Sequence, residues 1–219
     1  MTDLNVVRKA YLRVERVKLL RDLSLLDDKE ETIYDGFTQL ASNITGTPIS
    51  LVTMVAANYQ FFKSMVGLPD PWASRRKTPL SHSFCQHVVT SGEPLIITDA
   101  RELDFLKENQ AIPDLNVIGY LGIPVNLFDN RTLGSFCVID SEPREWTQLD
   151  IGIITEIAAV ISYEFDRRAL ARMDSVYQSE LDDLHTAIHE FLTEYETQSP
   201  LSQAHFLTRI RDWRKEYKI

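Results

Sequence analysis

The side chains most able to do chemistry lie in the middle of the chain, where Cys85 precedes His87 by two residues. A thiolate beside an imidazolium is reactive, because the positive charge lowers the pKa of the thiol. The stretch 81–90 is predicted to be a short helix, however, and residues two apart on a helix point to different faces. Free cysteines are usually buried. We therefore expect Cys85 to be a structural residue, and Cys137, which lies in an apolar stretch, even more so.

A metal site is the second chemical hypothesis. Its four candidate ligands are His82, Cys85, His87 and Cys137. Zinc requires four ligands that converge within bonding distance, and these spacings match no finger pattern. The sequence also lacks a Gly-rich phosphate loop, a paired acid motif and a Ser-His-Asp order. We therefore expect no metal, no other cofactor and no catalysis.

Two carboxylates, those of Asp99 and Asp140, follow apolar stretches that are predicted to be strands. A carboxylate at the end of a strand often accepts hydrogen bonds from backbone N–H groups and caps the next turn. We expect this structural role for both residues rather than acid–base catalysis.

A ligand pocket over the predicted sheet is the hypothesis that the aromatic residues favour. Small-molecule sites are mostly apolar and carry a few polar anchors, and Lys63, His87 and Asp99 are the candidate anchors. A filled core without a cavity is the alternative, and the sequence leaves both open. The candidate ligand-binding residues are Phe61, Lys63, Trp72, Phe84, Cys85, His87, Asp99 and Tyr120.

The composition sets limits on the class of protein. The 219 residues carry 23 Lys and Arg against 32 Asp and Glu, a net charge of −9, which disfavours binding to nucleic acid or to an anionic membrane. Two cysteines are too few for a disulfide-rich secreted scaffold. The charged N-terminus does not resemble a secretion signal, and no apolar stretch reaches the ~20 residues of a membrane span. We expect a cytoplasmic protein with reduced thiols.

The elements that must position these residues follow from hydrophobic periodicity. Helices are predicted over 3–26, 30–46, 81–90 and 147–171, with a last one carrying Phe206 to Tyr217. Strands are predicted over 49–55, 60–66, 95–98, 119–126 and 133–139, and an irregular loop over 67–79. Short hairpins favour an antiparallel sheet, and helices on its faces give an α+β domain. The apolar stripe from Met173 to Tyr195 must also be buried. It can fold back on its own domain, pair with residues 3–26, or pair with a second chain.

Seven short motifs in order resemble the GAF domain family. They are Glu15-Arg16 with Leu19, Leu23 and Leu26-Asp27; Pro48 to Val52; Gln60 to Ser64 with Gly67-Leu68; Ser83-Phe84-Cys85 with His87; Pro94-Leu95 with Asp99-Ala100; Gly119 to Val125; and Leu133 to Asp140 with Pro143-Arg144. The resemblance covers residues 13–168, which we expect to be the GAF domain. Residues 1–30 would form an N-terminal helix leading into it, and 169–219 a C-terminal helical extension.

The resemblance is to the subgroup found in bacterial sensor histidine kinases and diguanylate cyclases, and from the sequence we expect no output domain of those kinds here. It implies a non-enzymatic sensory module that binds a small ligand or a partner protein and signals through its terminal helices. It also implies a homodimer, since family members often dimerise through flanking helices. Covalent bilin attachment usually depends on a Cys-His pair, where this chain has Cys85-Gln86-His87. The alternatives are a cysteine-dependent redox enzyme like the free methionine sulfoxide reductases, which share the fold, and an interaction scaffold without a ligand.

Overall fold

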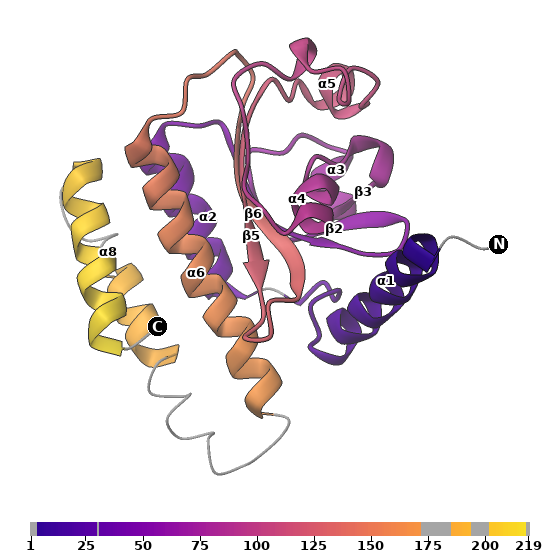
Figure 1. Cartoon of the computed structure of the whole chain (residues 1–219). Helices are drawn as coiled ribbons and strands as arrows, with labels where there is room; N and C mark the ends of the chain where they lie inside the picture. The colour runs from indigo at the N-terminus through magenta and orange to yellow at the C-terminus, as the bar shows by residue number, and fades with distance from the viewer. Residues whose placement is uncertain (1–3, 30, 172–184, 194–201, 218–219) are drawn as a thin grey trace.

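The computed structural model describes residues 4–29, 31–171, 185–193 and 202–217, and Figure 1 shows a central sheet with helices on both faces. In chain order the elements are α1 (Leu4–Asp22), α2 (Thr32–Thr45), β1 (Ile49–Val55), β2 (Tyr59–Val66), α3 (Trp72–Arg75), β3 (Lys77–Pro79), the 3-10 turn η1 (Leu80–His82), α4 (Cys85–Ser91), β4 (Leu95–Ile97), the 3-10 turn η2 (Ala100–Glu102), α5 (Ala111–Leu115), β5 (Gly119–Asn126), β6 (Thr132–Asp140), α6 (Gln148–Ala171) and α8 (Gln203–Tyr217). Residues 185–193 form a further helical segment. The predicted α+β class is confirmed.

The six strands form one antiparallel sheet in the order β3-β2-β1-β6-β5-β4. The hairpins β1–β2 and β5–β6 lie side by side because β1 pairs with β6, with Leu51 opposite Cys137. β1 is buried along its whole length. Covered on both faces, a strand of this kind needs no polar alternation, which explains the apolar and β-branched run 49–55.

One face of the sheet packs against α2 and α6, which form the larger part of the core. α2 ends at Gly46, whose φ of 67° is the left-handed conformation that glycine adopts without strain. The helix presents Ile33, Phe37, Leu40 and Ala41 to the core, as its spacing predicts. α8 lies outside α6, so that this side of the molecule is two helices deep (Figure 1).

The opposite face packs against α4, α5 and the connections around them, and the two core clusters are therefore separated by the sheet. Here the structure corrects two predictions. The loop predicted over 67–79 contains α3 and the edge strand β3, whose Thr78 pairs with Gln60; three residues are too few to show a sequence period. The helix predicted from residue 81 begins at Cys85. The Ser83 hydroxyl accepts a hydrogen bond from the Gln86 N–H at 3.0 Å, which satisfies one free donor of the first turn.

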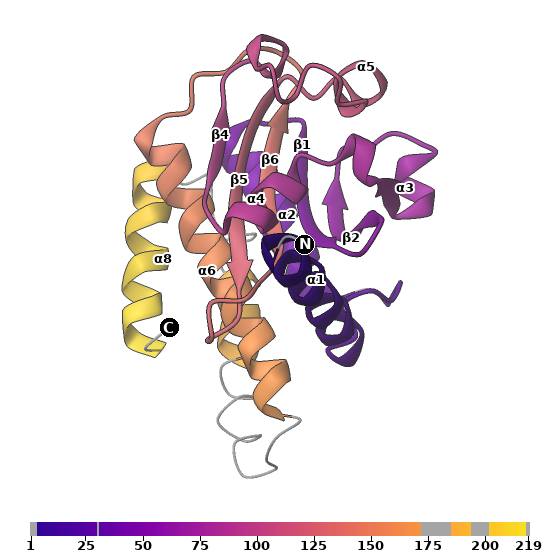
Figure 2. The same cartoon turned by 45° about the vertical axis from the view of Figure 1, so that its right-hand side comes forward.

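The N-terminal helix α1 lies on the side of the molecule away from α8 (Figures 1 and 2). Its end is fixed, because Leu20, Leu23 and Leu25 are buried in the α2–α6 core. The Arg16 Nε also donates a hydrogen bond to the Val55 carbonyl at 3.1 Å. Earlier in the helix Val14 remains 65% exposed.

The described part of the C-terminal stripe folds back on its own domain. Ile188 is fully buried, and a Cβ atom at Gly36 of α2 would lie only 2.9 Å from Leu192 Cδ1. The Phe191 ring lies 5.4 Å from that of Trp213 in α8. Of the three arrangements open from the sequence, segment 185–193 thus adopts the first, while the parts of the stripe at 173–184 and 194–195 lie outside the described residues.

Among the described helices, none combines the length and the apolarity that a membrane crossing requires.

Candidate functional site

A buried tyrosine and two buried thiols meet between the sheet and α4. Tyr120 of β5 and Cys137 of β6 point to the same face, because Gly122 lies opposite Cys137 and Tyr120 is two residues before Gly122. The Tyr120 ring lies over Gly122: a Cβ atom there would be 2.3 Å from Tyr120 Oη. Cys85 is the first residue of α4, the helix that packs on this face of the sheet.

The distances make this group one hydrogen-bonded unit. The sulfurs of Cys85 and Cys137 are 3.9 Å apart. The Tyr120 hydroxyl donates to Cys85 Sγ at 3.3 Å and lies 3.5 Å from the Ser135 hydroxyl. All four side chains are buried, so their hydrogen bonds replace those that water would otherwise make.

The environment separates the acidities of the two thiols. The hydrogen bond from Cys137 and then that from Tyr120 lower the pKa of Cys85 to about 7, against the opposing effect of burial. Burial raises the pKa of Cys137 well above its ordinary value, and the hydrogen bond to Cys85 adds to this. Of the pair, Cys85 is therefore the thiol that loses its proton first.

A cavity of about 20 Å³ adjoins Cys85 and Tyr120. That volume holds roughly one water molecule. Its walls are mostly apolar and are made by Leu51, Gln60, Phe62, Leu68, His82, Phe84, Cys85, Ala111, Leu115, Val117, Tyr120 and Ile139. The sequence leaves a ligand pocket and a filled core open as alternatives. In this conformation the cavity is so small that the core is nearly filled.

The polar edge of this cavity joins β2 to the segment before α4. The Ser83 hydroxyl donates to Gln60 Oε1 at 2.6 Å. His82 Nε2 lies 2.9 Å from Asp114 Oδ2 and so links the same segment to α5. Movement of residues 80–83 would therefore act directly on β2.

Lys63, three residues after Gln60 on β2, is fully buried and connects the sheet to the α1–α2 connection and, through Glu31, to α6. β2 has a register shift opposite Val52 and Thr53, and such a bulge re-aims a side chain. Lys63 Nζ lies 2.7 Å from Glu31 Oε1 and 2.6 Å from Asp27 Oδ1.

The same ammonium group also donates to the carbonyls of Ser24, Asp27 and Lys29, all in the α1–α2 connection. Glu31 in turn pairs with Arg168 near the end of α6. We call Asp27, Glu31, Lys63 and Arg168 the Lys63 network.

A model of the GAF domain matches residues 29–165 of this chain, more than half of its length. The chain belongs to the GAF domain family. The GAF sheet and its two helical layers are the scaffold that carries the thiols, the cavity and the Lys63 network. GAF domains are generally sensory or ligand-binding modules.

Among curated proteins, the GAF chain is 25% identical over 171 residues to a cyclic di-GMP phosphodiesterase of Pseudomonas aeruginosa. The match covers 78% of this chain and 27% of the relative, so the chain spans about a quarter of that protein's length.

Among solved structures, the GAF domain of a phosphoenolpyruvate-protein phosphotransferase from Coxiella burnetii is similar with a TM-score of 0.54 at 14% identity, over 75% of this chain and 98% of that one. Free methionine-R-sulfoxide reductase from Neisseria meningitidis is similar with a TM-score of 0.50 at 13% identity, over 69% and 89%. At these identities the likeness shows the fold alone.

The GAF fold brings together only part of the predicted ligand set. Phe84, Cys85 and Tyr120 meet at the cavity, with the Phe84 and Tyr120 rings 5.4 Å apart. Trp72 does not line the cavity, although its ring lies 4.9 Å from that of His82, which does. His87 points elsewhere: its ring lies 5.3 Å from that of Phe105, and partial burial lowers its pKa.

The remaining three predicted residues lie away from the cavity. Phe61 is buried in the core on the α2–α6 side of the sheet. Lys63 bonds to the α1–α2 connection instead of lining a pocket. Asp99 caps η2: its Oδ1 accepts from the N–H of Arg101 at 3.0 Å, and the Arg101 guanidinium holds its pKa below the usual value. The expected capping role of Asp99 is thus observed in the structure.

Sequence reasoning missed Gln60, Ser83 and Gly122 as members of the site. Gly122, in the middle of an apolar strand, was the available signal, because an isolated glycine in a strand often marks close approach of another group. It also missed Glu31 and Arg168, whose partnership depends on tertiary packing. Among the described residues, no three His, Cys, Asp or Glu side chains are grouped so as to hold a metal ion.

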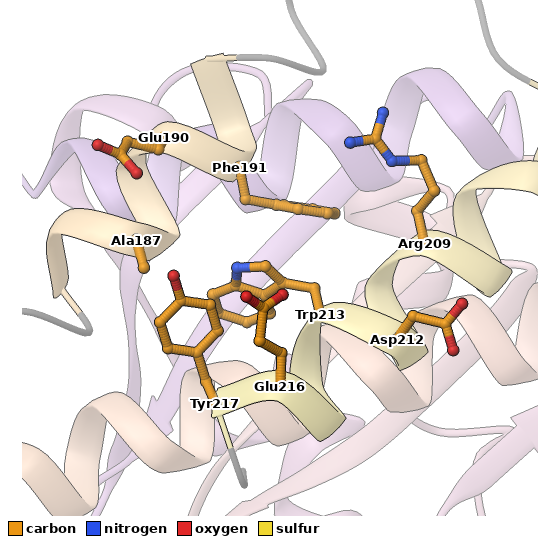
Figure 3. A pocket seen from close by; sticks show the side chains of 8 residues that line it. All are labelled: Ala187, Glu190, Phe191, Arg209, Asp212, Trp213, Glu216 and Tyr217. Carbon is orange, nitrogen blue, oxygen red and sulfur yellow. The ribbon is translucent and has the colours of Figure 1, made fainter.

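A larger hollow, of about 400 Å³, lies between segment 185–193 and α8 (Figure 3). It is lined by Ala187, Glu190, Phe191, Arg209, Asp212, Trp213, Glu216 and Tyr217. The rings of Trp213 and Tyr217 are 5.2 Å apart, while the carboxylates of Glu190 and Asp212 point away from its centre in Figure 3. No predicted site residue lies there.

Proposed function

We propose that this chain is a regulatory GAF module that acts in the cytoplasm and catalyses no reaction itself. A small ligand would enter the cavity at Tyr120 and Cys85, and the response would leave through the flanking helices. The observation that carries the proposal is the Lys63 network, which ties β2 to the end of α1 and the end of α6.

The path from the cavity to the helices is short. Gln60 lines the cavity and bonds to Ser83, and Lys63 follows on the same strand. A ligand that displaces residues 80–83 would shift β2 through the Ser83–Gln60 hydrogen bond. The shift of β2 would move the buried Lys63 ammonium group, and with it Glu31 and Arg168. A ligand shifts such an equilibrium only through its different affinity for the two states.

The lining favours a small, mainly apolar ligand with one polar group. The described lining side chains include Gln60 and His82 but no Lys or Arg, so an anionic phosphate would lack a partner there. Binding would require α5 and residues 80–83 to move outward, since the cavity now holds roughly one water. Indole and phenol are suitable probes, and cyclic AMP and cyclic GMP are charged comparators.

The test is hydrogen–deuterium exchange of the full chain with each probe, preceded by a thermal shift assay. We expect indole or phenol to raise Tm and to change exchange near Tyr120, at residues 23–29 and at the end of α6. We expect the cyclic nucleotides to do neither. An absence of any shift with all four probes would count against the ligand-sensing part of the proposal.

We further propose that a second copy of the chain is the partner, and that it packs on α1. A hollow of about 280 Å³ runs along Arg13, Val14, Val17, Lys18, Arg21, Asp22 and Ala57. Val14 is exposed there, and Leu4, Val7 and Tyr11 continue its helical spacing in the sequence. The C-terminal segment 185–193, by contrast, is already packed on its own domain.

Sedimentation analysis of the full chain tests this. We expect a dimer that Val14→Asp dissociates and that Phe128→Asp, at a similarly exposed residue of the β5–β6 turn, leaves intact. A monomer at all concentrations would refute the dimer and favour an interaction scaffold. A pull-down from lysate with and without residues 169–219 would then look for another protein.

One observation supports the reductase alternative, and another speaks against it. The two thiols lie close enough to react with each other. A free amino acid carries an ammonium and a carboxylate group, however, and among the described residues the lining of the cavity offers no Asp, Glu, Lys or Arg to pair with them. The phosphodiesterase activity of the relative is not carried over, because only 27% of that protein is matched.

A further inference from the structure

The buried cysteine pair has a use beyond packing. We propose that Cys85 and Cys137 form an internal disulfide on exposure to a small hydroperoxide, which makes this face of the sheet an oxidation site. The proposal rests on the geometry of the pair and does not depend on ligand binding at the cavity.

The first argument is distance. The sulfurs lie 3.9 Å apart, and a disulfide requires about 2.05 Å. The missing approach is therefore about 1.9 Å, from 3.9 minus 2.05. Cys85 is at the first turn of a seven-residue helix on the surface of the sheet, so α4 can supply that movement while Cys137 stays fixed in the centre of β6.

The second argument is the difference between the two thiols. The thiolate is the nucleophile, and the Tyr120 hydroxyl donates a hydrogen bond to Cys85 Sγ at 3.3 Å, stabilising negative charge on that sulfur. The pKa of Cys85 is lowered to about 7, while that of Cys137 is raised. Cys85 is thus the attacking sulfur, and Cys137 is the resolving one.

The third argument is access. The cavity of about 20 Å³ is bounded by Cys85 itself. Hydrogen peroxide is uncharged and only two oxygen atoms long, so it is the class of oxidant that such a space accommodates with least adjustment. Larger or charged oxidants, such as glutathione disulfide, would require α5 and residues 80–83 to open.

The chemistry balances in two steps. The Cys85 thiolate attacks one peroxide oxygen, so that an S–O bond forms and the O–O bond breaks. The product is a sulfenic acid, and the departing hydroxide becomes water with a proton from solvent. The Cys137 sulfur then attacks Cys85 Sγ, so that the S–S bond forms and the S–O bond breaks, and the second hydroxide leaves as water with the Cys137 proton. Two thiols and one peroxide give one disulfide and two waters.

The disulfide would tie the start of α4 to the middle of β6 beneath Tyr120. The cavity boundary at Cys85 would then be fixed to the sheet. Oxidation would thus fix one wall of the cavity, next to residues 80–83, which have to move when a ligand enters.

The experiment treats the reduced full chain with hydrogen peroxide and counts thiols after unfolding. In the wild type we expect both thiols to disappear together, with a monomeric product lighter by two hydrogen atoms that dithiothreitol restores. In Cys137→Ser we expect a sulfenic acid at Cys85 that dimedone traps. In Cys85→Ser we expect the remaining thiol to react at least about tenfold more slowly, because little of it is ionised.

Tyr120→Phe distinguishes a role in the reaction from a role in packing. We expect the peroxide rate of the wild type to rise with pH to half its maximum near pH 7, as the Cys85 pKa implies, and the midpoint of Tyr120→Phe to move upward. Two results would overturn the proposal. One is a wild type whose thiols both survive peroxide that oxidises N-acetylcysteine in the same tube. The other is oxidation that gives only intermolecular disulfides or sulfinic acid.

Discussion

Replacing Lys63 with methionine removes the charge at the centre of the Lys63 network while keeping most of the length of the unbranched side chain. The fully buried ammonium group pairs with Glu31 and Asp27 and donates to three backbone carbonyls. Methionine can donate to none of them. The side chain of Glu31 is only 14% exposed, so its carboxylate would lose a partner without gaining full solvation.

Breaking a buried ion pair on one side costs about 3–5 kcal/mol. The lower end applies here, because Glu31 keeps Arg168 and because the Asp27 side chain is 47% exposed. We expect Lys63→Met to lose about 3 kcal/mol of unfolding free energy. For a chain of this size that lowers Tm by roughly 6–12 °C.

The assay is urea unfolding followed by circular dichroism, with Lys107→Met as the matched control. Lys107 forms an ion pair with Asp104 on the surface, where both side chains are mostly exposed. We expect this control to change stability by less than about 0.5 kcal/mol. Equal stabilities of the two variants would refute the assignment of Lys63 as the connection between the sheet and the helices.

Three further predictions follow from individual contacts. Gly122→Ala places a methyl group against the Tyr120 ring and should cost about 1–3 kcal/mol, measured by urea unfolding; an unchanged midpoint would contradict the observed ring position. Burial opposes the shift, but the hydrogen bond from Lys63 lowers the pKa of Asp27. The Asp27–Lys63 pair therefore stabilises the fold above about pH 4, and this stabilisation is lost as the pH falls further. The acid-induced loss of stability should be smaller in Lys63→Met, and equal losses would argue against that pairing. Phe191→Ala should cost about 3–5 kcal/mol if segment 185–193 is docked in solution, and limited proteolysis should then cleave this segment faster; unchanged proteolysis would contradict the docking.

The sequence was sufficient for the elements whose signal is local. Helix α2 and the strands β1, β5 and β6 follow from hydrophobic period and β-branching. β3 was missed because three residues show no period. The start of α4 was misplaced because the cap lies in the Ser83 side chain rather than in the apolar pattern.

The site was harder to predict, because its contacts join distant parts of the chain. Cys85 and Cys137 are 52 residues apart, and neither the motif nor the period of either stretch fixes their separation. A bulge in β2 decides where Lys63 points, and strand alternation alone does not reveal a bulge. The aromatic residues suggest one shared pocket, but the sheet places Phe61 and Phe84 on opposite faces.

The central claim is that a change at Tyr120 and Cys85 reaches the flanking helices through Lys63. It is tested most directly by hydrogen–deuterium exchange of the full chain with and without saturating indole, in the wild type and in Lys63→Met. Lys63 does not line the cavity, so the variant should still bind. We predict that indole changes exchange at residues 23–29 and at the end of α6 in the wild type, and only around residues 80–120 in the variant. A wild-type response confined to residues 80–120, or an identical response in both proteins, would contradict the claim.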